Sequence, residues 1–243
     1  MSDERDRDHR FSDGEGFGDP YEGFDLDPPE LEVDPEQVDP VDSRALTDLL
    51  DERQIPKGQM DVEALIDVGL SYMQINRFEQ ATETLERAAR VADDPLLEQE
   101  AWVNKGAAHA ELEEYDEAIG AYEEALFIDD ESEHAATAET NLAYALWEAG
   151  RTEQALEHAE RAVEVDPRFG QAWYNRGFFL AERGLNEEAV DCFDNALRLD
   201  FRTPEILEEK AAALEHLGRD EEAERLSEEA DELRQRAEAR MVE

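Results

Sequence analysis

Pairs of alanines spaced seven residues apart recur five times in this 243-residue chain, and this pattern constrains the fold more than any other feature. The first alanines of successive pairs are separated by 37, 37, 34 and 34 residues, and a glycine or alanine stands twelve residues before each pair. The pairs are Ala81/Ala88, Ala118/Ala125, Ala155/Ala162, Ala189/Ala196 and Ala223/Ala230, and the preceding small residues are Gly69, Gly106, Ala143, Gly177 and Ala211. A fixed period of this length predicts stacked supersecondary units instead of one globular core.

Each unit has the pattern of two antiparallel helices. In the second unit Trp102, Gly106 and His109 share one helical face, a break follows at residues 113–114, and a second helical pattern spans residues 115–126. Glycines mark the corresponding break in the later units, where a helix ends and φ can turn positive: Gly150, Gly184 and Gly218. We expect the small residues to lie where the two helices cross closely, and the aromatic residues to fill the wider gap to the neighbouring unit.

The motif resembles the tetratricopeptide repeat, W-x2-L-G-x2-Y…A-x3-F…P. The second unit matches it with Trp102, Gly106, Ala118 and Tyr122, and the fourth does so with Trp173, Gly177, Ala189 and Phe193. The terminal proline is present only as Pro167, and units one and two each contain three extra residues. The resemblance covers residues 62–237 and implies an all-α, right-handed α-solenoid of about five helix-turn-helix repeats.

The repeat register predicts the division of the chain. The repeats are expected over residues 62–98, 99–135, 136–169, 170–203 and 204–237, and residues 238–243 are expected to end the last helix. Residues 1–42 combine prolines and glycines with dense acid and are predicted to be a disordered acidic tail. Residues 43–61 are predicted to hold a short amphipathic helix and a linker, and this helix either caps the first repeat or occupies the groove of the array.

The net charge of −44 is distributed over the whole chain. Residues 1–42 contribute −13 and the remaining residues −31, and the chain has only three lysines against 20 arginines. This composition resembles that of salt-in extreme halophiles of the haloarchaeal type, in which molar salt screens the repulsion between carboxylates. The alternative is an acidic protein that binds basic partners or mimics nucleic acid. Binding to nucleic acid is not expected, because phosphate contacts require clustered Lys or Arg.

No pattern of catalytic or metal-ligating residues is present in the sequence. None of the five histidines pairs with another at helical spacing, and the single cysteine, Cys192, is expected to be a partly buried thiol. No long apolar run predicts a membrane span, and the charged start of the chain has no secretory signal. We therefore expect a cytoplasmic protein that is not an enzyme and binds no metal or cofactor.

The resemblance implies a concave groove lined by the first helix of each repeat. Two residues before the small residue, units two to four place Asn104, Asn141 and Asn175, which we call the asparagine ladder. An asparagine amide can donate to and accept from the backbone of an extended peptide. Alternatively, these asparagines bond a neighbouring loop. Four aromatic residues are expected near the ladder, about half of which could be buried in the core instead: Tyr144, Trp147, Tyr174 and Phe178.

These features favour an adaptor that binds an extended peptide segment of another protein in the groove. Family members that capture acidic C-termini use basic groove residues, but the corresponding positions here contain no Lys or Arg. A neutral, apolar or basic peptide is therefore the expected ligand. The alternatives are a self-assembling structural scaffold and a non-catalytic subunit of an enzyme complex. The sequence leaves the partner and the oligomeric state open.

Overall fold

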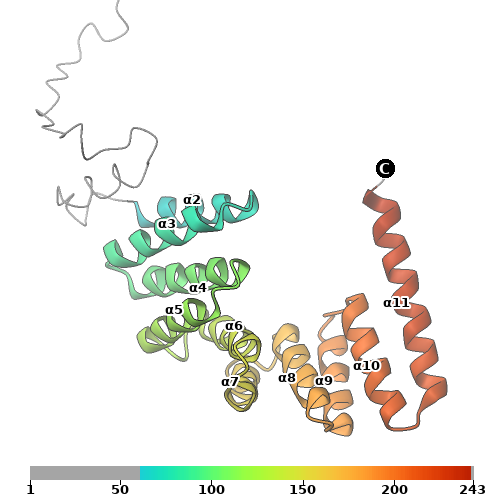
Figure 1. Ribbon diagram of the computed structural model, residues 1–243. Coiled ribbons are helices and arrows are strands. Elements are labelled where there is room, and N and C mark those ends of the chain that lie inside the picture. The colour runs from blue at the N-terminus through green and yellow to red at the C-terminus, as the bar shows by residue number, and fades with distance from the viewer. Residues whose placement is uncertain (1–60, 242–243) are drawn as a thin grey trace, which may run out of the picture. The chain divides into compact units, whose positions relative to one another are not determined.

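The computed structural model describes residues 61–241, which form helices joined by short loops (Figure 1). Within that range there are ten helices and no strand, so the predicted all-α repeat fold is confirmed. The helices are α2 (Val62–Gln74), α3 (Phe78–Val91), α4 (Pro95–Glu111), α5 (Tyr115–Ile128), α6 (Ala135–Glu148), α7 (Thr152–Val165), α8 (Gly170–Glu182), α9 (Asn186–Arg198), α10 (Pro204–His216) and α11 (Asp220–Met241). The predicted tail at residues 1–42 and the predicted helix within residues 43–60 lie outside the described residues.

The turn inside each helix pair follows one rule. A three-residue turn separates the two helices, and its middle residue adopts a left-handed conformation. The five middle residues are Asn76 (φ 57°), Glu113 (φ 60°), Gly150 (φ 78°), Gly184 (φ 76°) and Gly218 (φ 72°). This conformation satisfies the carbonyls at the end of a helix and favours glycine, which explains the glycines at the breaks of the last three repeats.

The small residue of each first helix faces the second helix of its own repeat. A Cβ atom added to Gly69, Gly106 or Gly177 would lie within 2.6, 2.5 or 2.8 Å of a side-chain carbon on the second helix. The side chains that these glycines accommodate are Leu85, Tyr122 and Phe193, which follow the first alanine of each pair by four residues. Tyr122 and Phe193 thus lie against the glycine of their own repeat, a contact that the expectation for the aromatic residues did not include.

In the third and fifth repeats, the two helices cross with a different pair of side chains in contact. Alanine replaces glycine there, as Ala143 and Ala211, and both are almost fully buried. The positions equivalent to Leu85 hold small residues in these repeats, Ala159 and Ser227. Glycine thus accompanies a large opposing residue, and alanine accompanies a small one.

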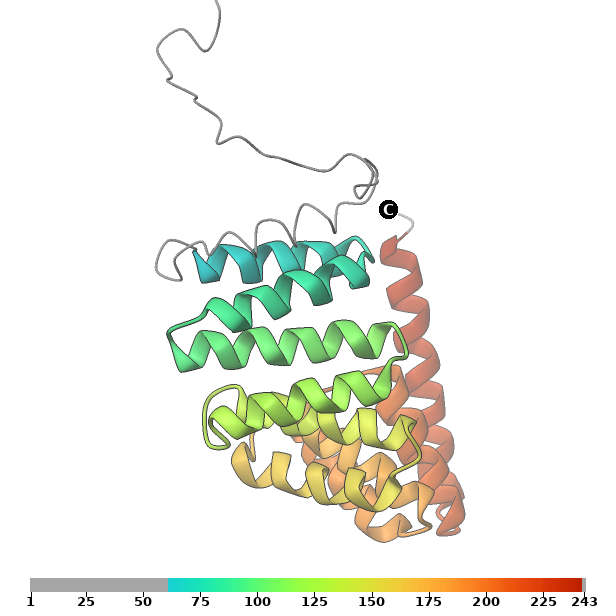
Figure 2. The same cartoon turned by 60° about the vertical axis from the view of Figure 1, so that its left-hand side comes forward.

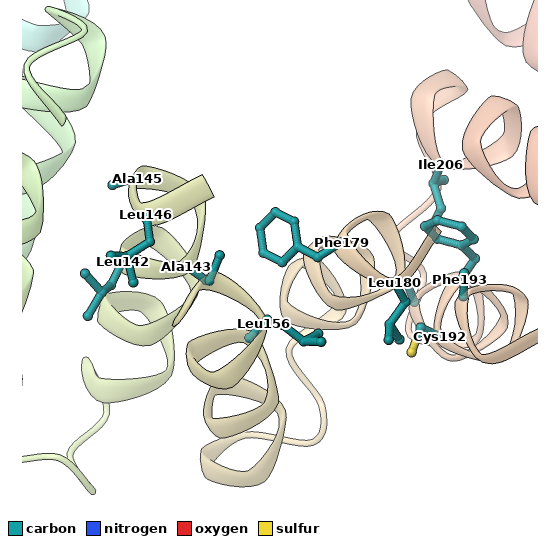
Figure 3. Packing of buried hydrophobic residues seen from close by; sticks show 14 of the residues in the cluster. Leu142, Ala143, Ala145, Leu146, Leu156, Phe179, Leu180, Cys192, Phe193 and Ile206 are labelled. Atoms are coloured by element: carbon teal, nitrogen blue, oxygen red, sulfur yellow. The ribbon is translucent and has the colours of Figure 1, made fainter. Parts of the chain in front are cut away.

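Consecutive helices pack in chain order (Figure 2), and buried side chains form a seam along the array. The largest apolar cluster extends from the second repeat to the fifth and includes Leu142 and Leu146 on α6, Phe179 on α8 and Phe193 on α9 (Figure 3). A separate cluster joins the first repeat to α4. Each repeat therefore gains its core from its neighbours, as expected of a solenoid.

The extra residues of the first repeat lie near the start of α4, and those of the second repeat lie in the loop after α5. Helix α4 begins at Pro95, after an N-cap in which Asp94 accepts from the backbone N–H of Leu96, and it has 17 residues. The side chain of Gln99 is fully buried and donates to the carbonyls of Ala125 and Asp129, at 3.0 and 2.5 Å. It also accepts from the hydroxyl of Ser132 at 2.5 Å. This glutamine attaches the inserted loop to the helix, and the repeat motif does not predict it.

Candidate functional site

A cavity of about 300 Å³ opens between α4, α6 and α8, the first helices of the second, third and fourth repeats. These helices contact one another in sequence as α4 with α6 and α6 with α8. Four of the seven predicted groove residues line the cavity, namely Asn141, Tyr144, Tyr174 and Asn175. The other lining residues are Ala107, Ala110, Glu111, Tyr122 and Gln171. We call this cavity, with its nine lining residues, the groove pocket.

The asparagine ladder does not present three equivalent side chains. Asn175 is 7% exposed, and its amide donates to the carbonyl of Thr140 on α6 at 3.3 Å. One amide donor of Asn175 therefore bonds the chain itself, although its acceptor lies on a helix and not on a loop as the alternative supposed. Asn141 forms a hydrogen bond with the hydroxyl of Tyr122, which is buried beneath the pocket. Both amides thus connect repeats in addition to lining the groove pocket.

Asn104 lies outside the groove pocket but along the same side of α4. It precedes Ala107 by three residues and Glu111 by seven, a spacing that places all three on one helical face. The side chain of Asn104 is partly exposed. A segment that fills the groove pocket and continues along α4 would therefore meet Asn104.

Trp147 and Phe178 pack between α6 and α8 and do not line the groove pocket. The ring of Trp147 stacks on Phe179 with centroids 4.9 Å apart, and it meets Phe178 edge-on at 5.6 Å. Both residues are partly buried against the main apolar cluster. Their surroundings match the alternative that part of the aromatic set belongs to the core, so we assign their contact mainly to the joint between repeats.

The hydroxyl groups of Tyr144 and Tyr174 are influenced by nearby carboxylates. Tyr144 is 45% exposed, and burial together with Glu148, Tyr115 and Glu111 raises the pKa of its hydroxyl. Burial, followed by the carboxylates of Glu209 and Glu205, raises the pKa of Tyr174 to about 12. Both hydroxyls therefore keep their protons at neutral pH, and that of Tyr174 can donate a hydrogen bond to a ligand.

The lining of the groove pocket contains no lysine, arginine or histidine. The first helices of the five repeats carry three such cations that are permanently charged, and each is directed toward the second helix of the preceding repeat. Lys105 lies 3.1 Å from Glu86, Arg176 3.5 Å from Glu160, and Lys210 2.5 Å from Asp194. We call these three contacts the joint ion pairs. The groove pocket can therefore attract a cation or bind neutral groups, but it has no charge with which to capture a carboxylate.

The joint ion pairs were not predicted from the sequence, although their residues occupy regular positions in the repeats. Each base stands one residue before the small residue, and each acid stands five residues after the first alanine of the preceding repeat. Reasoning from the motif also missed Glu111 and Gln171, because the family pattern specifies small and aromatic positions and leaves the polar positions open. Comparison of the repeats position by position would have identified both sets.

Three further observations concern the described part of the chain. Between residues 61 and 241, no group of three or more His, Cys, Asp or Glu side chains is placed to hold a metal ion. No helix in that range combines the length and the apolar character needed to cross a membrane. Cys192 is buried at 3% exposure, and burial raises its pKa to about 11, so its thiol is protonated at neutral pH.

Comparison with solved structures identifies similar folds. The chain resembles BtubC (BKLC) from P. vanneervenii at 19% identity, with a TM-score of 0.65 and coverage of 80% of this chain and 87% of that one. It resembles MamA at 17% identity, with a TM-score of 0.59 and coverage of 74% and 98%. For TTC0263, a thermophilic tetratricopeptide-repeat protein of Thermus thermophilus, the values are 23%, 0.57, 71% and 91%. At these identities the likeness concerns the fold.

Sequence comparisons assign the repeats. No curated protein matches the chain by sequence. Models of the tetratricopeptide repeat match residues 62–95, 97–168, 140–200 and 180–238, which together include every helix pair of the array. The chain therefore belongs to the tetratricopeptide-repeat family.

Proposed function

We propose that this protein is a non-catalytic adaptor that binds an extended segment of a partner protein along α4, α6 and α8. The observation that supports this most strongly is the groove pocket, where three consecutive repeats contribute side chains to one cavity. Stacked repeats create extended concave surfaces of this kind, which repeat proteins use for binding. A segment longer than the groove pocket would continue past Asn104 on α4.

We expect the predicted contact residues to differ in role, some contacting the ligand and others joining neighbouring repeats. Tyr144 offers an exposed ring and a hydroxyl, and Tyr174 and Asn141 offer polar groups at the wall of the groove pocket. Asn175 lines the groove pocket and also bonds the neighbouring repeat, whereas Trp147 packs in the joint between repeats. We expect Tyr144 to act as the main anchor, because its ring is the most exposed aromatic surface among the predicted residues and can be covered by a ligand.

A comparison of binding and stability tests this assignment. Tyr144→Ala should weaken binding of a partner isolated in molar KCl by about 1–2 kcal/mol, with little change in the free energy of unfolding. Trp147→Ala should lower the free energy of unfolding by about 2–4 kcal/mol, because it removes a large ring from the packed joint. Phe127→Ala is the matched control, since Phe127 is an aromatic residue of α5 that is 87% exposed and lies outside the groove pocket.

Two other outcomes would contradict the binding of a partner in the groove. If Tyr144→Ala leaves affinity unchanged while Phe127→Ala reduces it, the partner binds a surface of the second helices and the groove assignment is wrong. If the chain shows no partner and its mass rises with concentration in molar salt, the self-assembling scaffold is the better account. Sedimentation equilibrium across a range of protein concentrations distinguishes these outcomes.

We also propose that the acidic surface is an adaptation to high salt and that the protein works in a cytoplasm rich in salt. The support is the net charge of −44 with three lysines. All three joint ion pairs lie at contacts between helices, so most remaining carboxylates face solvent or one another. Molar salt reduces the Debye length to about 3 Å and so removes most of the resulting repulsion.

A further inference from the structure

Three first helices end in a glutamate, and they are the three helices that line the groove pocket. Glu111 is the last residue of α4, Glu148 of α6 and Glu182 of α8. Each stands five residues after the small residue of its repeat, so the three occupy one position of the repeat register. The first and last repeats differ at this position, where α2 ends in Gln74 and α10 in His216. We call these three residues the terminal glutamates.

The terminal glutamates do not stabilise the helices that carry them. The carbonyls at the C-terminus of a helix give it a partial negative charge, so a cation is favoured there and a carboxylate is disfavoured. Within residues 61–241 none of the three forms an ion pair with Lys, Arg or His, while the permanent cations of the same helices belong to the joint ion pairs. The acidic composition of the chain alone does not explain this position, because both end repeats lack a glutamate there.

Two of the terminal glutamates meet at Tyr144. Glu111 lines the groove pocket, and Glu148 accepts a hydrogen bond from the Tyr144 hydroxyl. Glu111 and Tyr144 line the same pocket, and Glu148 stands one helical turn after Tyr144 on α6, so both carboxylates belong to the surroundings of one exposed aromatic residue. An exposed tyrosine ring beside two carboxylates suits an organic cation, because the ring face attracts positive charge and the carboxylates accept its hydrogen bonds.

We propose that the groove pocket binds an arginine or lysine side chain from the extended partner segment. The cation lies over the ring of Tyr144 and donates to Glu111 and Glu148, while the adjacent partner backbone meets the amide of Asn141. This inference depends on the proposed groove function and adds the chemical class of the ligand. Charge complementarity supports it, because the lining of the groove pocket contains a carboxylate and no basic residue. Arginine suits the site better than lysine, because its planar guanidinium can stack on the ring and donate to two carboxylates together.

The test must separate this contact from general attraction to an acidic protein. A basic peptide binds any surface of a chain with a net charge of −44 at low salt, so binding is measured in molar KCl, where distant charges are screened. The probe is a fluorescent library of extended synthetic peptides in which one central residue is Arg, Lys, citrulline or Glu. Citrulline keeps the shape and most of the hydrogen-bond donors of arginine and removes its charge, so the ratio of the Arg and citrulline affinities reports the cation contact.

The variants are matched in charge. The full-length protein with Glu111→Gln and Glu148→Gln is compared with a control that carries Glu124→Gln and Glu157→Gln, two exposed glutamates on the second helices α5 and α7. We expect arginine peptides to bind about three- to tenfold more tightly than their citrulline counterparts. The groove variant should lose this preference, and the control should keep it. Tyr144→Phe should keep most of the preference, whereas Tyr144→Ala should remove it and weaken the binding of every peptide by about five- to thirtyfold.

The outcomes distinguish the cation site from the groove function. Equal affinity for arginine and citrulline peptides, with binding still lost in Tyr144→Ala, overturns the cation site and leaves the groove function intact. Peptide binding that Tyr144→Ala does not change overturns both. Equal loss of the arginine preference in the groove variant and in the control overturns the cation site, because the effect then belongs to net charge. If no peptide of the library binds in molar KCl, the cation site is also rejected.

Discussion

The first helices of this array have two sides with opposite electrostatic character. On the packed side, the residue before the small residue is a base in three repeats, and each base is paired with an acid of the preceding repeat. On the groove side, Glu111 and Glu148 act on Tyr144, and none of the three terminal glutamates forms an ion pair with a basic residue of the described chain. The difference indicates that the permanent cations of the first helices stabilise the joints between repeats and leave the groove negative.

The largest expected effect is that of salt, because salt screens the repulsion between carboxylates that have no basic partner. Two carboxylates about 10 Å apart repel by about 0.4 kcal/mol in water, and a chain with 67 acids contains many such pairs. Raising KCl from about 0.1 M to molar concentration should therefore increase the free energy of unfolding by on the order of several kcal/mol. Chemical denaturation at each salt concentration, monitored by circular dichroism, measures the change. An unfolding midpoint that stays flat would contradict the high-salt proposal.

A glycine substitution on the packed side should have the next largest effect. Gly106→Ala places a methyl group 2.5 Å from the ring of Tyr122, so the second repeat must shift, and we expect a loss of about 1–3 kcal/mol. Gly120→Ala on α5 is the control, since nothing lies within 4 Å of its added Cβ atom. It should stabilise the protein by about 0.5–1 kcal/mol through helix propensity. Urea titrations of the two variants should shift in opposite directions, and equal shifts would show that the crossing has been assigned incorrectly.

The stability of the protein at alkaline pH tests the contribution of Tyr174, which lies between the packed side and the groove side. Its pKa rises from 10.0 to about 12 on folding, so the folded state holds the proton more tightly than the unfolded state does. The stabilisation is present below pH 10 and is lost as the pH rises through about 12. Tyr174→Phe should reduce the loss of stability over this window by about 1 kcal/mol, because the partly exposed ring experiences less than the full shift. Identical alkaline limbs for the two proteins would show that Tyr174 does not contribute.

The smallest expected effects come from substituting one glutamate on the packed side and one on the groove side, which compares the two sides directly. Glu86→Gln removes the partner of Lys105, whose side chain is only 14% exposed, and should destabilise the protein by about 0.5–1 kcal/mol. Glu111→Gln removes a charge that is unfavourable at a helix C-terminus and should be neutral or stabilising by about 0.3–0.5 kcal/mol. A double-mutant cycle of Glu86 and Lys105 in molar KCl isolates the pair energy. Destabilisation of similar size by both glutamate substitutions would remove the distinction between the two sides.

The helical repeat could be predicted from sequence because its constraints are local and periodic. The alanines and glycines at fixed spacing specify where helices cross, and the glycines of the last three repeats specify where helices end. The match between glycine and a large opposing residue could not be inferred from one repeat, because it depends on Tyr122 or Phe193 across the crossing. Asn76 and Glu113 occupy the left-handed turn position without being glycine, so residue type alone did not reveal the common turn.

The groove was predicted less completely, for a physical reason. A position in the repeat register specifies on which helical face a side chain lies, but not which atoms it meets on the next repeat. Asn175 has the same register as Asn104, yet it is buried and donates to Thr140. Trp147 has the spacing of a groove residue, yet its ring stacks on Phe179. These contacts depend on how neighbouring repeats stack, and that geometry is absent from the motif.

The most direct test of the account is site-specific photocrosslinking to the partner segment. A benzophenone amino acid is placed at Tyr144 in the groove pocket or at Phe127 on the exposed face of α5, and each protein is irradiated with its partner in molar KCl. The account predicts a crosslinked adduct from position 144 and none from position 127, with the attachment site mapped next to an arginine or lysine of the partner. An adduct from position 127 alone, or equal yields from both positions, would contradict binding in the groove.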